Sequence, residues 1–448
     1  MVFYLCAAVA APATAQALPE PNRDQLLNGL HVILWQRPGD QNVLVKLRVH
    51  SGAAFDLAGK SGLMALLGDA LFPDPATREY VTEELRGRLE VITDYDSINI
   101  TISGRAGELE RIIELLRNAL VETALTTENV AKLRDARIKL LREMTISPAM
   151  IADRAVAARL LGEFPYGRPS AGSAETLARI ERADLLLARQ RFLNPDNATL
   201  VIVGAFDEHR ALRGIRQLLG SWRKSDQIVP PTFRQPDVPD TRPLVINQPG
   251  EGAEVRIAVR GLARSDGDYP AAALLAVVAQ ERWQSALREL SKGSFFVRHE
   301  AHSLPGVFVL GASVQTSTAA KTISAARKVV QSVISSPPSP AELERAKSEV
   351  LAALNGQASQ PDLAVRQLLD SETFKLGPFA QQVASVQSAS AADVQRAAIK
   401  IFKNAPVATV VVGSYDQLES LGSLGPVELL GDQPPPKPTA VSAPVKKP

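Results

Sequence analysis

The sequence of 448 residues has few of the side chains that bind metals or form disulfides. It contains a single cysteine, Cys6, which excludes an internal disulfide and a pair of thiolate ligands for zinc. No two histidines stand four positions apart, so the zinc helix H-x-x-x-H is absent, and so is the serine hydrolase segment G-x-S-x-G. The five histidines are His31, His50, His209, His299 and His302.

The sequence also lacks a strong charge of either sign. Its 50 Lys and Arg residues nearly balance 48 Asp and Glu residues, which gives a formal net charge of +2. This overall balance predicts neither nucleic acid nor an anionic membrane as a partner. After the N-terminal segment, no apolar run reaches the about 18 residues needed to span a bilayer. With 45% hydrophobic and 22% charged residues, the composition is that of a globular protein of two or more domains.

The first 17 residues are small and apolar, and their end offers two Ala-x-Ala cleavage positions. This pattern is typical of a signal peptide, although the basic start is missing. We therefore expect residues 1–17 to be a signal peptide and the protein to be periplasmic. The alternative is a disordered, alanine-rich N-terminus. Leu5 precedes Cys6 where a lipoprotein signal has a small residue, so we expect no lipid anchor.

Two pairs of similar segments lie at nearly the same separation along the chain. Residues 44–53 resemble residues 254–263, which follow 210 positions later, and residues 200–207 resemble residues 409–416, 209 positions later. All four segments have the alternating, β-branched composition of strands. The repeat predicts an α+β protein with two homologous domains, each an α/β sandwich.

Proline-rich segments mark the borders of these domains. Residues 228–243 contain five prolines and no periodicity, which predicts a semi-rigid linker. We assign residues 18–227 to the N-terminal domain and residues 244–425 to the C-terminal domain. Residues 426–448 are rich in proline and basic, and we expect them to form a disordered tail.

The stretch 61–72, SGLMALLGDALF, constrains the function most strongly. Its leucines and alanines recur at spacings of three and four, which predicts a buried amphipathic helix entered through Gly62. The stretch resembles the metal-binding helix of the pitrilysin/insulinase family of zinc peptidases, whose H-x-x-E-H motif supplies two zinc ligands and a general base. In this alignment Ala65 and Asp69 stand at the two His positions, and Gly68 stands at the Glu position. The resemblance implies a retained helix and lost metal chemistry.

The resemblance covers most of the chain, from about residue 24 to residue 415. It includes the lead GKSG before the helix, the segment PYGRP at 165–169 and the segment RGLARSDGDY at 260–269. It implies two α+β domains of the mitochondrial processing peptidase type, joined like a clamshell, and dimerisation in the short members of the family.

The third zinc ligand of the family is a Glu, which aligns with Glu143, and its companion Glu is replaced by Ala136. Asp69 and Glu143 together offer carboxylates without imidazole, a donor set that favours hard cations over Zn²⁺. An active peptidase that uses these two residues with another metal is an alternative; we assign no metal and no catalytic residue to this chain. The segment HEAH at 299–302 has the wrong spacing for a zinc helix, and as a strand it would place its histidines on opposite faces.

The second domain of these peptidases usually supplies an Arg and, seven residues later, a Tyr that hold the substrate. Here Arg288 stands at the Arg position and Phe295 at the Tyr position. Phenylalanine keeps the ring and loses the hydroxyl donor. The resemblance implies that Arg288 and Phe295 bind substrate, and the alternative for Arg288 is a solvated helix residue.

These features together predict a protein that is inactive alone. Our first hypothesis is a non-catalytic subunit of a heterodimeric zinc peptidase, in which an active family member carries the zinc and this chain completes the chamber around a peptide or unfolded protein. The chain itself would need no cofactor. The alternative, from a different class of function, is a non-proteolytic scaffold or binding protein that uses the same duplicated fold.

Overall fold

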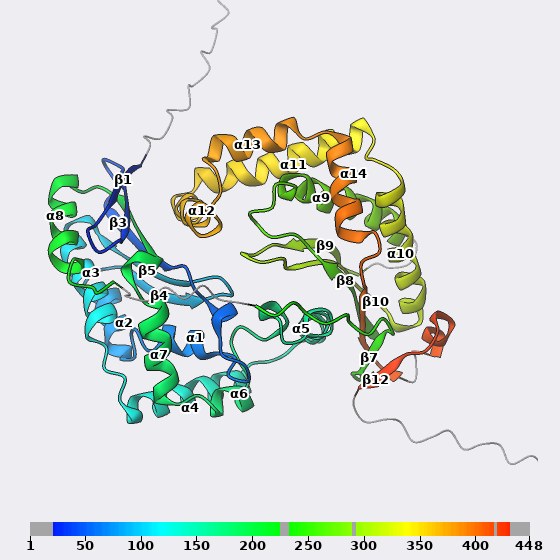
Figure 1. Ribbon diagram of the computed structural model, residues 1–448, viewed down its shortest axis with the longest axis horizontal. Helices are drawn as coiled ribbons and strands as arrows, with labels where there is room; N and C mark the ends of the chain where they lie inside the picture. Colours follow the sequence, from blue (N-terminus) through cyan, green and yellow to red (C-terminus); the bar gives the residue numbers. More distant parts are fainter. Residues whose placement is uncertain (1–20, 225–232, 289–292, 416–418, 431–448) are drawn as a thin grey trace, which may run out of the picture.

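The computed structural model describes residues 21–224, 233–288, 293–415 and 419–430. They form two halves, each built on a six-stranded sheet (Figure 1). The strands of the first sheet are β1 (Asn22–Gln25), β2 (His31–Gln36), β3 (Asn42–Val49), β4 (Arg88–Thr93), β5 (Ile98–Arg105) and β6 (Ala198–Gly204). Those of the second are β7 (Leu244–Asn247), β8 (Gly252–Arg260), β9 (Phe295–Glu300), β10 (Val307–Gln315), β11 (Ala408–Gly413) and β12 (Glu428–Leu430).

Helices connect and cover the strands of both halves. The first half contains α1 (Leu63–Asp69), α2 (Pro75–Glu83), α3 (Leu109–Arg117), α4 (Thr127–Glu143), α5 (Pro148–Leu161), α6 (Ala174–Ala178), α7 (Arg182–Phe192) and α8 (Glu208–Leu219). The second half contains α9 (Tyr269–Leu287), α10 (Ala319–Ser335), α11 (Pro340–Ser359), α12 (Pro361–Phe374), α13 (Phe379–Ser388) and α14 (Ala391–Phe402). No helix within the described residues is both long enough and apolar enough to cross a membrane.

The two sheets repeat one topology. The order is β1-β2-β6-β3-β5-β4 in the first sheet and β12-β7-β11-β8-β10-β9 in the second. Corresponding pairs in the two sheets are parallel, β2 with β6 and β7 with β11, and the pairs that follow them in these orders are antiparallel. The repeated segments found in the sequence correspond to β3 with β8 and to β6 with β11. The predicted α+β fold with two homologous halves is confirmed.

The outer edges of the two sheets differ from each other. In the first, β1 pairs antiparallel with β2 through a tight turn, where Gly29 adopts a φ of +93°. In the second, β12 pairs parallel with β7. This corrects the predicted tail, because Glu428–Leu430 lie in an ordered strand whose main chain is bonded to the sheet. The described part of the predicted linker, residues 233–243, contains no helix or strand, and residues 1–20 and 431–448 lie outside the described part of the chain.

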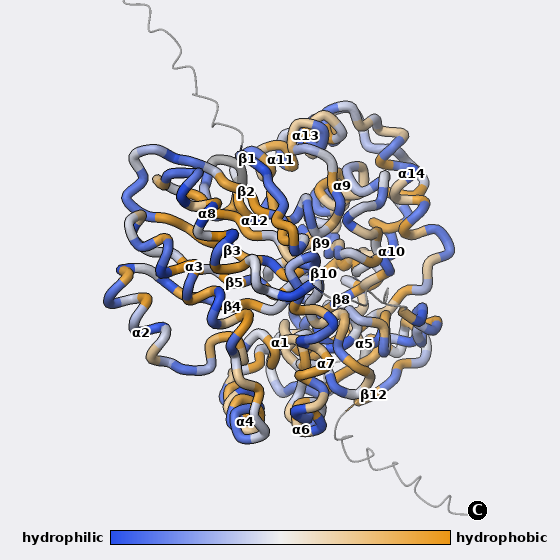
Figure 2. The backbone as a smooth tube through the Cα atoms, turned by 60° about the vertical axis from the view of Figure 1, so that its left-hand side comes forward, coloured by the Kyte–Doolittle hydropathy of each residue, from blue (hydrophilic) through white to orange (hydrophobic). Residues whose placement is uncertain are grey.

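Each half covers the open face of the other half's sheet with one helix. Along β6, Leu200 and Ile202 face the core made with helices of the first half, whereas Val201 and Val203 face α12 from the second half. Along β11, Val411 faces the core of the second half, whereas its neighbours on the strand face α5 from the first half. Figure 1 shows α12 lying against the first sheet, and Figure 2 shows hydrophobic stretches running through both sheets. Central strands are therefore buried on both faces.

Polar bonds fasten the two halves together. Asp96, before β5, is buried and accepts hydrogen bonds from the Tyr166 hydroxyl at 3.0 Å and from the Ser303 amide at 3.1 Å. His302 Nδ1 lies 2.7 Å from the other carboxylate oxygen of Asp96, and the His302 ring stacks on the Tyr166 ring with centroids 4.3 Å apart. Burial raises the pKa of Asp96, but the bonds from His302 and Ser303 outweigh it and hold the pKa below its usual value. The two halves thus form one structural unit.

Candidate functional site

The candidate site lies around α1, the helix that occupies the place of the metal-binding helix. Gly62 precedes it with a φ of +94°, and a Cβ there would lie only 2.8 Å from Leu177. The buried Asp56 carboxylate accepts hydrogen bonds from the amides of Gly62 and Met64, both at 2.7 Å. Burial raises the pKa of Asp56 to about 7, and the two amide donors oppose this rise. The frame that holds such a helix in place is retained.

The residues at two of the three motif positions have no side chain that binds metal. Ala65 is almost completely buried in the first core. A Cβ at Gly68 would lie 2.6 Å from Thr93 Oγ1 at the end of β4, so no side chain fits at position 68 unless Thr93 moves. The space beside the helix is filled by the neighbouring strand.

The third motif position carries Asp69, whose carboxylate is bound by an arginine. Arg137 Nη1 on α4 donates to Asp69 Oδ2 at 2.5 Å, and Arg137 Nε donates to the Ala171 carbonyl at 3.2 Å. The Arg137 side chain is only 16% exposed, and that of Asp69 is 38% exposed. A guanidinium on a short, partly buried hydrogen bond neutralises the carboxylate and repels any cation nearby. Asp69 is therefore engaged in an ion pair.

Glu143, the residue aligned with the third ligand, ends α4 and points into solvent. Its side chain is 64% exposed and its carboxylate lies 3.8 Å from Lys139 Nζ. In the described residues no three His, Cys, Asp or Glu side chains lie close enough together to hold a metal ion. A catalytic zinc site has three protein ligands and one open position. The residues present therefore do not fit zinc.

Three of the histidines, His50, His299 and His302, make structural hydrogen bonds. His50 lies between Thr199 of β6 and Thr373 of α12, with each ring nitrogen 2.9 Å from a hydroxyl. His299 Nε2 accepts from the Leu262 amide at 3.0 Å, and burial lowers the pKa of His299 to about 4. The strand expected over residues 299–302 ends at Glu300, because His302 turns away from the sheet to Asp96.

Arg288 and Phe295 lie in different surroundings. Arg288 is exposed directly after α9 and lines a hollow of about 720 Å³ together with Glu251 and Glu254. Phe295 begins β9 and packs against the core of the second half. No ring contact between the two side chains occurs among the described residues. Gln280 on α9 accepts from the Val297 amide at 2.5 Å and ties α9 to β9. Substrate binding by Arg288 and Phe295 stays a prediction.

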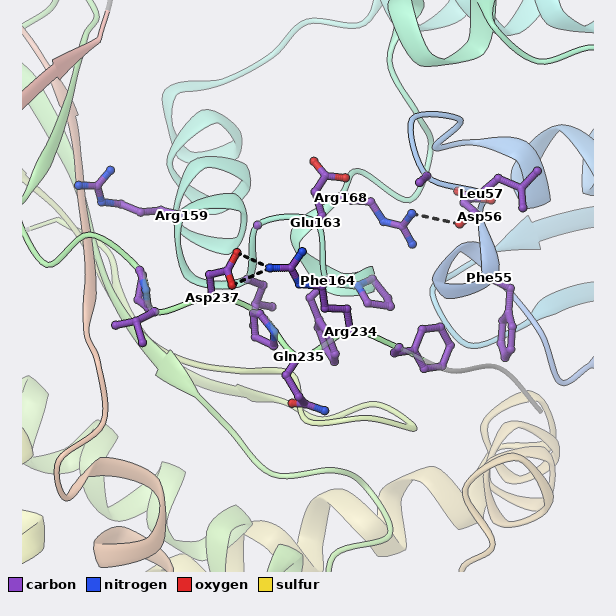
Figure 3. A pocket seen from close by; sticks show the side chains of 18 of the residues that line it. Phe55, Asp56, Leu57, Arg159, Glu163, Phe164, Arg168, Arg234, Gln235 and Asp237 are labelled. Carbon is purple, nitrogen blue, oxygen red and sulfur yellow. Dashed lines mark hydrogen bonds and ion pairs between the residues drawn. The ribbon is translucent and has the colours of Figure 1, made fainter. Parts of the chain in front are cut away.

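A hollow of about 700 Å³ opens beside the lead into α1 (Figure 3). Phe55 packs between Phe192 and Phe233 with ring centroids 5.0 and 5.7 Å apart. Arg168 donates to the Asp56 and Ala54 carbonyls, and Arg234 pairs with Asp237. Because its lining mixes cations and carboxylates in similar numbers, the hollow favours no one class of charged ligand.

Sequence reasoning missed Arg137 and Asp56, the two residues that define the state of the site. Arg137 stands directly after Ala136 in the run that contains the third ligand position. A new cation next to a lost acidic residue, combined with the loss of both histidines, was the signal that could have identified it. Asp56 stands six positions before Gly62, and only the fold shows that it caps the helix.

Comparisons with known proteins support the resemblance. Residues 179–350 match the family model described as the peptidase M16 inactive domain. An uncharacterized zinc protease of Mycobacterium tuberculosis is 24% identical over 217 residues, which are 47% of this chain and 49% of that protein. The match thus spans about half the length of this curated relative.

Solved structures share the fold over nearly the whole chain. A protease from Helicobacter pylori has a TM-score of 0.80 at 17% identity, covering 88% of this chain and 100% of that chain. The peptidase M16 inactive domain from Pseudomonas fluorescens has a TM-score of 0.77 at 18% identity, and the match covers 88% of this chain and 98% of that chain. The first half of the periplasmic protease PqqL from Escherichia coli has a TM-score of 0.72 at 15% identity, and the match covers 90% of this chain and 93% of that chain. Over residues 179–350 the chain is thus similar to the peptidase M16 inactive domain, and over nearly its whole length it shares the fold of M16-type peptidases.

Proposed function

We propose that this protein is the non-catalytic subunit of a heterodimeric, periplasmic zinc peptidase. The observation that carries the proposal is the combination at α1, where Asp56 and Gly62 keep the helix in place while Arg137 neutralises the residue at a ligand position. A fold kept around a lost site points to a role in shape and binding. The active partner would supply the zinc and the general base, and this chain would supply part of the chamber wall.

The substrate of the complex would be an extended peptide or an unfolded protein. Within the described residues β4 pairs with β5 alone, so one edge of β4 is open to another strand. This edge runs beside α1, since Thr93 and Val91 are the neighbours of Gly68. A strand edge binds an extended peptide through main-chain hydrogen bonds with little sequence preference. The partner's active site could then act on a peptide held by this chain.

Periplasmic location rests on the expected signal peptide. Residues 1–17 lie outside the described residues, so the proposal is supported by their composition alone. N-terminal sequencing of the protein purified from periplasmic and cytoplasmic fractions tests it. A start near residue 18 in the periplasmic fraction is the expected result, and an intact N-terminus in the cytoplasm would contradict it.

The test of the subunit proposal is peptidase activity on a panel of unstructured peptides. Three samples are compared: this chain, an intact H-x-x-E-H relative from the same cell, and an equimolar mixture of the two. We expect only the mixture to cleave efficiently, a chelator to abolish cleavage, and the two chains to co-elute in gel filtration. If the mixture equals the intact relative and the chains elute separately, the proposal fails and the scaffold function takes its place.

A further inference from the structure

A second surface of the first half, away from α1, combines cations with exposed leucines. A hollow of about 940 Å³ lies between α7 and the segment that follows α8. Four cations line it and no carboxylate does. We call it the basic–leucine surface. Its cations are Arg189, Arg191, Arg223 and Lys224, and its apolar residues are Leu120, Val121, Leu186, Leu187, Leu193 and Trp222.

Within the described residues, no acidic side chain pairs with the cations of this surface. Arg189 donates to three main-chain carbonyls, those of residues 120, 121 and 123, and no carboxylate of the described residues pairs with it. Arg191 lies over the ring of its neighbour Phe192 at 5.2 Å. Arg223 and Lys224 are exposed, and no carboxylate of the described residues lies within ion-pair distance of either. Among the described residues the surface therefore presents four cations without a carboxylate partner, in a protein whose formal net charge is only +2; Asp226 lies outside the described residues.

The leucines beside these cations are unusually accessible. Leu186 and Leu187 on α7 are 37% and 45% exposed. Leu27, at the tip of the β1–β2 turn, is fully exposed. This tip is fixed to the same surface, because Asn28 Nδ2 donates to the carbonyls of Leu219 at 2.8 Å and Trp222 at 3.0 Å. Apolar side chains next to cations on a rigid platform are the pattern of a peripheral membrane site.

We propose that the basic–leucine surface binds an anionic phospholipid membrane, with its cations on the lipid phosphates and its leucines inserted at the interface. The cations gain electrostatic attraction to an anionic lipid surface, and the leucines gain burial in acyl chains. Single-stranded nucleic acid fits less well, because it requires exposed aromatic rings for stacking and Trp222, the only aromatic residue of this surface, is buried. The site goes beyond the subunit function and does not depend on it.

Sedimentation of the full chain with lipid vesicles tests the proposal. We expect binding to vesicles that contain phosphatidylglycerol and none to pure phosphatidylcholine. Binding should weaken between about 0.1 M and about 1 M salt, as the Debye length falls from about 10 Å to about 3 Å. Inorganic phosphate alone should neither bind measurably nor displace the protein, because a free anion lacks the acyl chains. Strong phosphate binding, or equal binding to both vesicle types, would overturn the proposal.

Matched variants assign the binding to this surface. R223Q/K224Q removes two exposed cations and should lower the vesicle partition coefficient about thirtyfold, since each cation near an anionic membrane contributes about 1 kcal/mol. R327Q/K328Q on α10 makes the same change in charge at exposed positions of the second half and should have little effect. L27S should weaken binding, while V238S, at another highly exposed position, should not.

Two outcomes would overturn the assignment. One is an equal loss of vesicle binding in R223Q/K224Q and R327Q/K328Q, which would indicate a response to net charge only. The other is tight binding of single-stranded DNA that R223Q/K224Q abolishes while vesicle binding persists, which would make this a nucleic-acid surface. Neither outcome changes peptide cleavage by the mixed subunits, so this proposal and the subunit proposal fail separately.

Discussion

Breaking the ion pair between Asp69 and Arg137 gives the most direct test of the reasoning about α1. The pair joins α1 to α4 at 2.5 Å, with side chains 38% and 16% exposed. Exposed ion pairs contribute about 0.2–1 kcal/mol, whereas hydrogen bonds to charged groups in protein interiors contribute about 1.5–3 kcal/mol. For a half-buried pair we expect D69A and R137A each to lower the free energy of unfolding by about 1–2 kcal/mol.

The double variant D69A/R137A should lower the free energy of unfolding by less than the sum of the two single variants, with a coupling energy of about 1 kcal/mol. Urea unfolding followed by circular dichroism measures these free energies at one pH and salt concentration. The matched control is the pair Arg234–Asp237, which is almost fully exposed and should show no measurable coupling. A coupling energy of zero between Asp69 and Arg137 would refute the argument that the arginine holds this helix in place of a metal.

Three further perturbations test other parts of the structure. Burial lowers the pKa of His50 to about 3, so the unfolded chain binds a proton that the folded chain does not; the contribution of His50 to stability should fall as pH drops below about 6.5, by roughly 2 kcal/mol at about pH 5, and H50Q should remove this share of the pH dependence in urea titrations while the shares of His299 and Asp56 persist. A65H/D69H, with Gly68 kept because no side chain fits beside Thr93, should stay zinc-free in metal analysis after gel filtration and bind zinc only when R137A is added, because the guanidinium repels the metal; stoichiometric zinc in the double variant would contradict this. L369A, at a buried position of α12, should lower the free energy of unfolding by about 2–4 kcal/mol and speed hydrogen exchange in α12. L430A, at the exposed edge of the second sheet, should lower the free energy of unfolding only slightly.

The tautomer of His50 explains why this residue responds to acid. The Thr373 hydroxyl donates to the Leu369 carbonyl at 2.8 Å, so it must accept from His50 Nδ1–H. His50 Nε2 is then unprotonated and accepts from the Thr199 hydroxyl. Protonation of Nε2 breaks this bond in a buried site between the two halves. Because Arg48 and Lys375 also raise the cost of a charge there, acid should loosen α12 before it affects either sheet.

Local sequence patterns predicted the elements of the fold well. The alternation of valine and leucine over residues 42–50 predicted β3, and the spacing of leucines over residues 61–72 predicted α1. The separation of the repeated segments predicted that the two sheets share a topology. These features depend on neighbouring residues, whose periodicity is decided by which face of a strand or helix is buried. The tail was wrong by a few residues, because Glu428–Leu430 pair with a strand that lies far away in the sequence.

The sequence by itself determined the lost chemistry, since Ala65 and Gly68 cannot bind a metal in any fold. Only the tertiary structure decided what replaced it, because Arg137 and Asp69 are 68 positions apart and meet only when α4 packs beside α1. Packing likewise decides that α5 and α12 each cover the sheet of the other half, and that cations from α7 and from the segment after α8 lie on one surface. The periodicity of a helix or strand can be recognised in a short stretch of sequence. Contacts between distant residues depend instead on how the folded helices and strands pack against one another.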